Sequence, residues 1–498
     1  MAQPRYISLL LDHVVGAAHV WEGAQPLAKR GFCQPDTGFL GVLDAVSDTP
    51  TGFWMVFAFD ILKDKKGDVV KPALRQIKFR AASPEAAQDA VDAITDALYP
   101  DRRTKKILFI VNPFGGTKYA KVCYNHIIFP MMRMAGLHEH HEMIGKLRRK
   151  YKCAITVSGD GVFHELVNGL LLRPDWETAR QLPIGIVGSG SANALSRNLD
   201  INFRELAVLA ALKARSRPMD VFSYTQNGVR MFSHLLVMFA FLGDLDIESD
   251  RYRFMGSTRF TIAAIVRLIK FRSYKTRLYM LTADKASRFR LDNTNTGAGG
   301  YGPPSLYTSP SACNYTSWPL QVDSYVQFFV ATNLPWISSE FIAAPMARMD
   351  DGAISVLWAE ELSRMQTLGV VLDQESGAHM TFEAIRHARV VAYVLEPDTY
   401  VYNRKAAGPP RLETKTSDPS VAEPAQIPAG SGRAVTPPAN RKRAGIMDVS
   451  GEEVMYGPMV VEVHPRMINI VVPPWLDIGR WERGFRERFG AKVQPERF

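Results

Sequence analysis

The sequence predicts an α/β protein in which a doubly wound, mostly parallel sheet lobe is followed by an antiparallel sheet lobe, with a small β-rich module at the N-terminus. Between residues 104 and 220, short apolar runs alternate with helical patterns, which is typical of a parallel sheet covered by helices. Beyond residue 220, helical patterns are few and strand patterns recur at residues 277–281, 325–332, 354–359, 389–395, 459–463 and 467–471.

Residues 1–100 contain the patterns that predict the N-terminal module. Apolar stretches around residues 6–15, 38–46 and 52–61 predict strands, and residues 84–98 predict the helix that closes them. This order resembles a pleckstrin-homology-like (PH-like) domain. A structural extension packed on the following lobe is the other interpretation that the sequence leaves open.

Three glycine-rich turns follow successive strand patterns of the α/β lobe. They read NPFGGTK at residues 112–118, SGDG at 158–161 and GSGSANAL at 188–195. Because the carboxyl ends of parallel strands meet at one edge of a sheet, we expect the turns to lie together, where such folds bind ligands. One nucleotide would then contact all three turns.

The second turn carries a carboxylate, Asp160, between Gly159 and Gly161. Glycines let the backbone approach a phosphate closely, and the helix that follows offers free N–H groups to it. An acid beside a polyphosphate is repelled unless a cation or a transferable proton is present, so Asp160 indicates phosphoryl transfer and a proton acceptor open to its ligand. The alternative is that Asp160 only caps a helix.

Composition limits the classes of function. A formal net charge of +10 over 498 residues favours an acidic partner, such as a nucleotide or an anionic membrane surface. The basic residues are dispersed without a nucleic-acid-binding motif, so no nucleic acid is expected. No apolar run approaches the roughly 20 residues of a membrane-spanning helix. The four cysteines are sparse and lack metal-ligand spacing, which predicts a reducing, cytoplasmic location.

An apolar run at residues 235–242 leads into four acids separated by single residues: Asp244, Asp246, Glu248 and Asp250. Their alternation predicts that the side chains project together from an extended turn. Carboxylates this close repel one another unless cations lie nearby. The segment is therefore either part of a site for a cationic ligand or a surface network of ion pairs with the neighbouring arginines.

These segments resemble the sphingosine kinase branch of the diacylglycerol kinase-like lipid kinases. The resemblance is carried by NPFGGTK, SGDGVFHELVNGL, RPDWETA, GDLDIESDRYRFMGSTRF, MDDG and SGEEVMYGPMVVEVHP. It is close over residues 104–280 and continues in pieces to about residue 473. It implies that the second lobe is an antiparallel β-sandwich. It also implies phosphorylation of the primary hydroxyl of a sphingoid long-chain base (sphingosine, sphinganine or phytosphingosine) with ATP and Mg²⁺.

The resemblance also implies roles for individual residues. Asp160 would accept the hydroxyl proton, and Asp246 would bind the ammonium group of the lipid. Phe239 and Phe241 would contact the lipid, and Asp351 would bind the metal. The nucleotide would be held by residues of both lobes: Asn112, Gly115, Gly116, Ser158, Gly161, Glu165, Gly190, Ser191, Asp250, Arg253, Arg259 and Glu452. For Glu165, helix capping is an alternative.

The predicted domain boundaries place the N-terminal module at residues 1–100, the nucleotide-binding α/β lobe at 104–220 and the lipid-binding lobe at 221–480. Two inserts in the last lobe are expected to be flexible, because residues 285–322 are rich in Gly, Pro, Ser, Thr and Asn and residues 404–445 in Pro, Ala and Lys.

A helical pattern at residues 259–272 has apolar residues on one face and Arg267, Lys270 and Arg272 beside it. A core helix with basic edges accounts for this pattern. A lid over the lipid chain that touches an anionic membrane accounts for it as well, and the resemblance favours the lid. The lid implies peripheral association with an intracellular or plasma membrane.

The sequence departs from the family pattern in two places. The segment between Gly136 and Tyr151 is short, His-rich and helical in pattern, so we expect one strand of the parallel sheet to be missing. Ser450 stands where the family has an aspartate before Gly-Glu. Alternative functions are therefore a catalytically impaired lipid-binding protein, or a diacylglycerol or ceramide kinase, although those two lipids carry no free amine for Asp246. The preferred base and the oligomeric state are not indicated.

Overall fold

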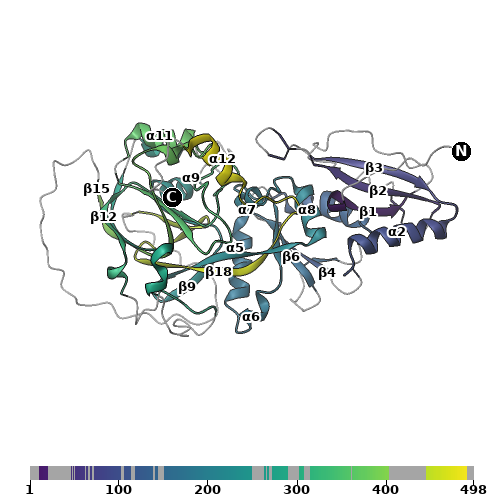
Figure 1. The fold of residues 1–498 in the computed structure, drawn as a ribbon, viewed down its shortest axis with the longest axis horizontal. Helices are drawn as coiled ribbons and strands as arrows, with labels where there is room; N and C mark the ends of the chain where they lie inside the picture. The colour runs from purple at the N-terminus through teal and green to yellow at the C-terminus, as the bar shows by residue number, and fades with distance from the viewer. Residues whose placement is uncertain are drawn as a thin grey trace, which may run out of the picture.

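The computed structural model describes residues 11–20, 46–47, 49, 51–61, 63–64, 68–69, 72–102, 106–113, 118–137, 141–143, 151–249, 263–264, 266–268, 272–289, 302–307, 314–360, 362–402 and 445–490. A three-stranded sheet lies near the N-terminus, and a 15-stranded sheet runs through the rest of the molecule (Figure 1).

The N-terminal module is the three-stranded antiparallel sheet with one long helix. Its strands are β1 (Val14–His19), β2 (Phe53–Asp60) and β3 (Ala73–Arg80), preceded by the short 3₁₀ helix η1 (Leu11–His13). Helix α2 (Pro84–Leu98) has the predicted bounds, because the Ser83 side chain accepts the N–H of Ala86 and Pro84 starts the first turn. Most of residues 6–15 and 38–46 lie outside the described residues.

The α/β lobe contains the parallel part of the large sheet. Strands β7 (Ile184–Gly188), β6 (Tyr151–Ser158), β4 (Lys106–Val111) and β5 (His141–Met143) lie in this order, all parallel to their neighbours. The helical segments between and after them are α3 (Ala120–Cys123), the π-helical η2 (Tyr124–Ile128), α4 (Phe129–Met134), α5 (Asp160–Leu171), α6 (Trp176–Ala179), α7 (Ala194–Asn198) and α8 (Arg204–Lys213). Strand β6 is almost wholly buried, as expected for a strand covered on both faces.

The strand that we expected to be missing is present. Residues His141–Met143 form β5, which pairs in parallel with β4 in the register Ile107 to His141 and Phe109 to Met143. The helical pattern predicted there is therefore wrong. The strand has only three residues, too few for a strand pattern to be visible in the sequence.

The second lobe is built from antiparallel strand pairs. Its strands are β8 (Ser216–Gln226), β9 (Val229–Ser233), β10 (Leu236–Ala240), β11 (Ser273–Thr282), β12 (Leu320–Val326), β13 (Phe328–Thr332), β14 (Ile354–Ala359), β15 (Arg386–Tyr402), β16 (Met447–Val449), β17 (Glu452–Val454) and β18 (Met459–Val471). Its helical segments are α9 (Phe241–Ser249), η4 (Ala283–Phe289), η5 (Tyr315–Ser317), α11 (Arg364–Leu372), η6 (Ala378–Thr381) and α12 (Arg480–Phe489). The predicted fold class is therefore confirmed.

Strand β18 connects the two lobes. It pairs antiparallel with β8 and β15, and at Ile470 it pairs in parallel with Ile184 of β7. The yellow strand in Figure 1 runs along this junction. A segment near the end of the chain thus continues the sheet whose edge carries the glycine turns.

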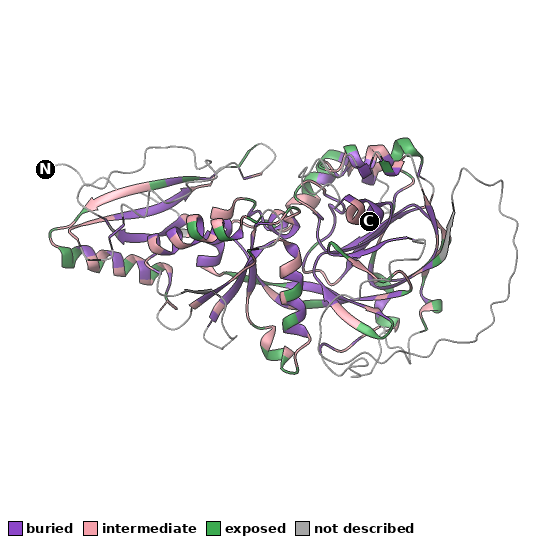
Figure 2. Ribbon diagram, turned by 180° about the vertical axis from the view of Figure 1, so that it is seen from behind, coloured by how far each residue is buried: buried purple, intermediate pink, exposed green. Residues whose placement is uncertain are grey.

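Two apolar cores stabilise these lobes. The larger core runs from the N-terminal module through the α/β lobe to α11 and α12, and the smaller one lies inside the second lobe. Most strands of the second lobe are coloured as buried in Figure 2. The insert predicted at 285–322 is wrong in part, because η4, η5 and the start of β12 lie within it. Residues 404–444 of the other insert lie outside the described residues.

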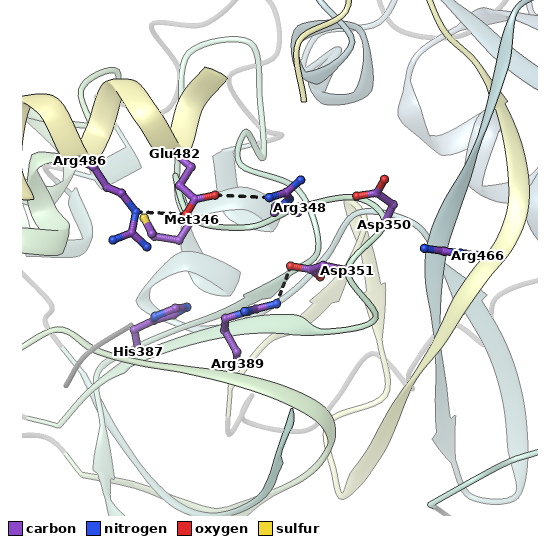
Figure 3. Close-up of a pocket in the computed structure, with 9 residues that line it drawn as sticks. All are labelled: Met346, Arg348, Asp350, Asp351, His387, Arg389, Arg466, Glu482 and Arg486. Carbon is purple, nitrogen blue, oxygen red and sulfur yellow. Dashed lines mark hydrogen bonds and ion pairs between the residues drawn. The ribbon is translucent and has the colours of Figure 1, made fainter. Parts of the chain in front are cut away.

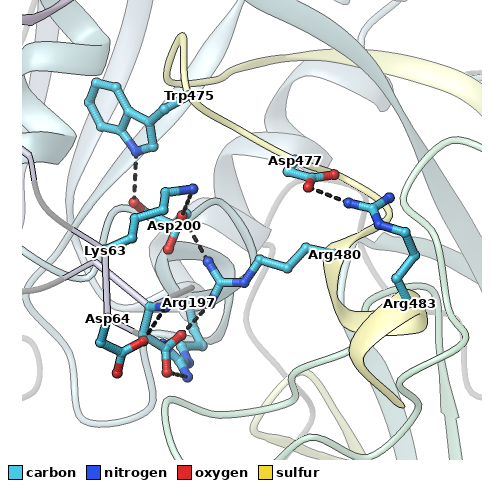
Figure 4. Close-up of polar contacts among 9 residues, drawn as sticks. Lys63, Asp64, Arg197, Asp200, Trp475, Asp477, Arg480 and Arg483 are labelled. Atoms are coloured by element: carbon cyan, nitrogen blue, oxygen red, sulfur yellow. Dashed lines mark hydrogen bonds and ion pairs between the residues drawn. The ribbon is translucent and has the colours of Figure 1, made fainter. Parts of the chain in front are cut away.

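A buried ion-pair network joins α12, α7 and the N-terminal module (Figure 4). The Arg480 guanidinium lies 3.0 Å from Asp200, just after α7, and also binds Asp68 of the module. Lys63 lies 3.4 Å from the same Asp200 carboxylate, and Arg197 pairs with Asp68. The side chains of Arg480 and Asp200 are only 12% and 5% exposed, so water screens their ion pair little, whereas the Lys63 side chain is 36% exposed.

Candidate active site

The second and third glycine turns lie against each other. The Ser189 N–H donates to the Ser158 carbonyl over 2.8 Å, which joins the ends of β6 and β7. A Cβ atom on Gly190 would lie 2.5 Å from the Gly159 Cα, so no side chain fits at this crossing. Beside them, the Asn112 N–H donates to the Val157 carbonyl over 3.3 Å, which places the start of the first turn at the same edge.

The Asp160 carboxyl group is turned toward the start of α7. Its Oδ2 accepts the N–H of Ala194 over 2.9 Å, and its Oδ1 accepts the N–H of Leu195 over 3.0 Å. The residue is 7% exposed, and burial raises the pKa of the carboxyl while the backbone N–H groups lower it. The expectation that Asp160 is open to its ligand is therefore wrong for this structure. Its carboxylate is buried, and both oxygens accept N–H groups from the start of α7.

The backbone amides of the turns are partly occupied. The Gly190 N–H donates to Asn193 Oδ1 over 2.9 Å, and Asn193 in turn donates to the Gly190 carbonyl. The expected phosphate contact of the Gly190 amide would have to compete with this bond. At the start of α5, no side chain caps the helix, because the preceding residue is Gly159. Ser191, on the third turn, is exposed.

Two other residues of α5 are clearly placed. Glu165 is exposed, and no side-chain hydrogen bond caps α5, so the alternative that Glu165 caps its own helix is not supported. Asn168 is buried; its Nδ2 donates to the Phe232 carbonyl over 2.7 Å and its Oδ1 accepts the Phe232 N–H over 2.8 Å. Asn168 therefore fixes α5 against β9.

A hairpin of the second lobe reaches the SGDG turn. Ser450 and Gly451 connect β16 to β17 with φ values of +55° and +86°, as in a type I′ turn. The Ser450 hydroxyl lies 2.6 Å from that of Ser233. Glu452 Oε1 lies 3.9 Å from the position that a Cβ on Gly161 would take. The structure thus brings Glu452 to the start of α5, although 290 residues separate them in the chain.

The acidic segment is helical and not extended, so that prediction is wrong. In α9, Asp244 is buried, accepts the hydroxyl of Tyr274 over 2.5 Å and lies 3.5 Å from Arg267. Arg267 also pairs with Glu248. The ion-pair interpretation therefore holds for Asp244 and Glu248, but within the protein and not on its surface. Arg267, expected at the basic edge of a lid, is only 5% exposed.

Asp246 is a partly exposed acid of α9, as is Glu248, and it lies beside Asp448 of β16. Asp448 is fully buried, and burial together with the Asp246 carboxyl raises the pKa of Asp448 well above its usual range. Sequence reasoning missed Asp448. The available signal was only that it stands two residues before Ser450 in the segment that resembles the family pattern.

The two predicted lipid contacts lie in the cores. Phe239 is fully buried in the smaller core, where its ring lies 5.2 Å from that of Tyr274. Phe241, 4% exposed, belongs to the larger core. Both stand on the segment that leads into Asp246, so they fix the start of α9.

Asp351 lines a polar pocket of about 380 Å³ (Figure 3). Its carboxylate lies 2.7 Å from Arg389, and burial raises the pKa of Asp351 while Arg389 lowers it. The other lining residues are mostly charged: Met346, Arg348, Asp350, His387, Arg389, Arg466, Glu482 and Arg486. The observed partner of Asp351 is thus a guanidinium group.

Five predicted nucleotide contacts lie outside the described residues: Gly115, Gly116, Asp250, Arg253 and Arg259. Within the described part of the chain, no three His, Cys, Asp or Glu side chains are grouped so that they could hold a metal ion. None of the helices in that part is long and apolar enough to span a membrane.

The chain has relatives of known family among known proteins. Residues 106–224 match the family described as the diacylglycerol kinase catalytic domain. The chain is 29% identical to "Sphingosine kinase 1" of Arabidopsis thaliana over 352 residues, which cover 67% of this chain and 72% of that protein. It is 31% identical to "Sphingosine kinase 1" of Homo sapiens over 325 residues, which cover 59% of this chain and 83% of that protein.

A solved diacylglycerol kinase structure from Bacillus anthracis aligns over 74% of this chain and 97% of its own, with 13% identity and a TM-score of 0.43. This similarity is too low to support a conclusion. The sequence relatives are sufficient: the chain belongs to the sphingosine kinase family of diacylglycerol kinase-like lipid kinases.

Proposed function

We propose that this lipid kinase transfers the γ-phosphoryl group of ATP to the primary hydroxyl of a sphingoid long-chain base. The observation that carries the proposal is the position of Asp246. It is partly exposed on α9, next to the hairpin whose Glu452 reaches the SGDG turn. A carboxylate there suits the ammonium group of an amino alcohol, and the charge-assisted contact gains strength where water is scarce.

The glycine turns would hold the nucleotide. Helix α5 starts at the crossing of Gly159 and Gly190, and a helix start favours negative charge. The crossing excludes side chains, so the backbone can approach phosphate oxygens closely. Magnesium bound with the nucleotide would neutralise charge on those oxygens.

Asp160 remains our proposed proton acceptor, but its carboxylate is already bound to two backbone N–H groups. Each of its oxygens accepts one backbone N–H, and a carboxylate oxygen has two lone pairs. The bonds to Ala194 and Leu195 would fix the carboxylate and favour its ionised form. A lipid hydroxyl would then donate its proton to a remaining lone pair of the carboxylate. Only 7% of Asp160 is exposed, so the hydroxyl would have to approach closely to reach it.

The protein would act in the cytoplasm and bind membranes only peripherally. The positive net charge favours an anionic membrane surface as the source of the lipid. In the helical residues 266–268, Val266 is 44% exposed and offers apolar surface for such contact.

A panel of lipid acceptors tests the proposed function. Purified protein, ATP and Mg²⁺ are incubated with sphinganine, phytosphingosine, ceramide or diacylglycerol in mixed micelles, and transferred phosphate is measured. We expect the two free bases to be phosphorylated and the two lipids without a free amine to react at least about tenfold more slowly. Preferred phosphorylation of diacylglycerol or ceramide would contradict the proposal and favour those alternatives.

A further inference from the structure

The two carboxyl groups of Asp246 and Asp448 lie within hydrogen-bonding reach of each other. Asp448 stands on β16, which pairs with β10 at Met238, and α9 with Asp246 follows β10 directly. Two ionised carboxylates at this distance would repel each other strongly where water is excluded. The contact therefore requires a proton or a cation between the two groups.

The bonding of Asp448 identifies the atom that would carry such a proton. Its Oδ1 accepts the N–H of Gly451 over 2.8 Å. Its Oδ2 is buried and has no hydrogen-bond donor among the described residues. A buried carboxylate oxygen without a donor is costly, whereas a protonated oxygen can donate to a neighbouring carboxylate.

The surroundings of Asp448 favour a proton over a metal ion. The groups that face it are Asp246 of α9, Glu452 of β17 and Tyr224 of β8, and burial with the two acids Glu452 and Asp448 raises the pKa of Tyr224 to about 12. All of these neighbours are acids, so none supplies a positive charge. These side chains do not form a metal-binding group in the described part of the chain.

We propose that Asp448 is a positioning residue for Asp246: it carries a proton on Oδ2 and donates it in a hydrogen bond to the Asp246 carboxylate. That bond would keep Asp246 ionised and oriented for contact with the ammonium group of the lipid. The inference rests on the proposed function, since it concerns how the same site recognises an amino lipid. It gives the chain a second acid in the head-group site, on strand β16, which ends directly before the turn that holds Ser450.

The proposal distinguishes asparagine from alanine at position 448. The amide of Asp448→Asn can accept from Gly451 with its oxygen and donate to Asp246 with its nitrogen, as the protonated acid would. Asp448→Ala removes the donor and leaves Asp246 unsupported. If Asp448 instead acted as an ionised carboxylate, both variants would lose the same charge and the same function.

The experiment measures kcat and KM of the full chain for sphinganine and for ATP in wild type, D448A, D448N and the hairpin control E453Q. Glu453 pairs with Asp448 across the hairpin. We expect D448A to lose about tenfold or more in kcat/KM for sphinganine, with its KM for ATP within about twofold of wild type. We expect D448N to recover kcat/KM to within about threefold of wild type, and E453Q to behave like wild type. Equal losses in D448N and D448A, or no loss in D448A, would overturn the proposal.

Infrared difference spectroscopy decides the matter if D448A does not fold. Wild type minus D448N at neutral pH should show the C=O stretching band of a protonated carboxylic acid, and the bands of an ionised carboxylate there would refute the proposal. A wild-type protein that phosphorylates no sphingoid base would instead refute the proposed function. The spectroscopic result would still stand in that case, so the two failures can be told apart.

Discussion

The Asp160 carboxylate accepts the backbone N–H of Leu195 over 3.0 Å, and this bond ties the start of α5 to the start of α7. The residue that the sequence marks as the proton acceptor is therefore also a structural link between the second and third glycine turns. The two roles differ in what a substitution at position 160 should change.

Asp160→Asn should affect both roles, in separate measurements. The amide nitrogen of asparagine cannot accept one of the two N–H groups, so the free energy of unfolding should fall by about 1–3 kcal/mol. Loss of the proton acceptor should lower kcat by about 100-fold or more. Chemical denaturation and steady-state kinetics measure the two effects. A kcat within about threefold of wild type, together with reduced stability, would leave Asp160 only its structural role.

Asp246→Asn should weaken the use of amino lipids specifically. The substitution keeps the size of the side chain but removes the negative charge that faces the ammonium group. We expect kcat/KM for sphinganine to fall by more than about tenfold, or about 1.4 kcal/mol, while the KM for ATP stays near its wild-type value. Glu375→Gln, at an exposed acid, is the charge-matched control. An unchanged kcat/KM would refute the ammonium-binding role.

Arg480→Ala should destabilise the junction of α12, α7 and the N-terminal module. It removes one of the two cations that pair with the buried Asp200, which keeps only Lys63 at 3.4 Å, and a hydrogen bond to a charged group contributes about 1.5–3 kcal/mol. Arg483→Ala is the matched control on the same helix. Arg483 pairs with Asp477, and the two side chains are 58% and 46% exposed. Loss of an exposed ion pair lowers the free energy of unfolding by at most about 1 kcal/mol. Equal losses of unfolding free energy in both variants would contradict this difference.

Asp220 should make the stability depend on pH. The buried carboxylate accepts the N–H of Gly352 over 2.6 Å and of Arg466 over 2.7 Å, and burial raises the pKa of Asp220 to about 6. Below that pKa the folded state binds more protons than the unfolded state, whose pKa is about 3.9. The stabilisation relative to Asp220→Asn should therefore grow as pH falls from about 7 to about 5, by about 1 kcal/mol. A constant difference between the two proteins in denaturant titrations would contradict this.

Local patterns allowed much of the fold to be predicted. Helix α2 has the bounds that its serine cap and proline start indicated, and β14 occupies the predicted residues 354–359. Predictions were wrong where one sequence pattern fits both a helix and an extended segment. The stretch in α9 alternates acids with apolar residues, yet Phe241 and Leu245 are one helical turn apart and both buried. The two strands predicted at 459–463 and 467–471 are one strand, β18.

The site was predictable only as far as local sequence specifies it. The crossing of the second and third turns follows from neighbouring parallel strands, and the Gly190 position requires glycine. The contact of Asp246 with Asp448 joins segments about 200 residues apart, through the pairing of β10 with β16. No local pattern encodes that pairing. Nor does any indicate that the start of α7 would bind the Asp160 carboxylate.

Transfer of labelled phosphate from ATP to sphinganine by the purified chain tests the central claim most directly, when it is measured beside binding of the same lipid. The account predicts turnover, with the phosphate on the primary hydroxyl of the product. Retained lipid binding without any transfer would contradict it, and would identify the chain as a lipid-binding protein that has lost catalysis.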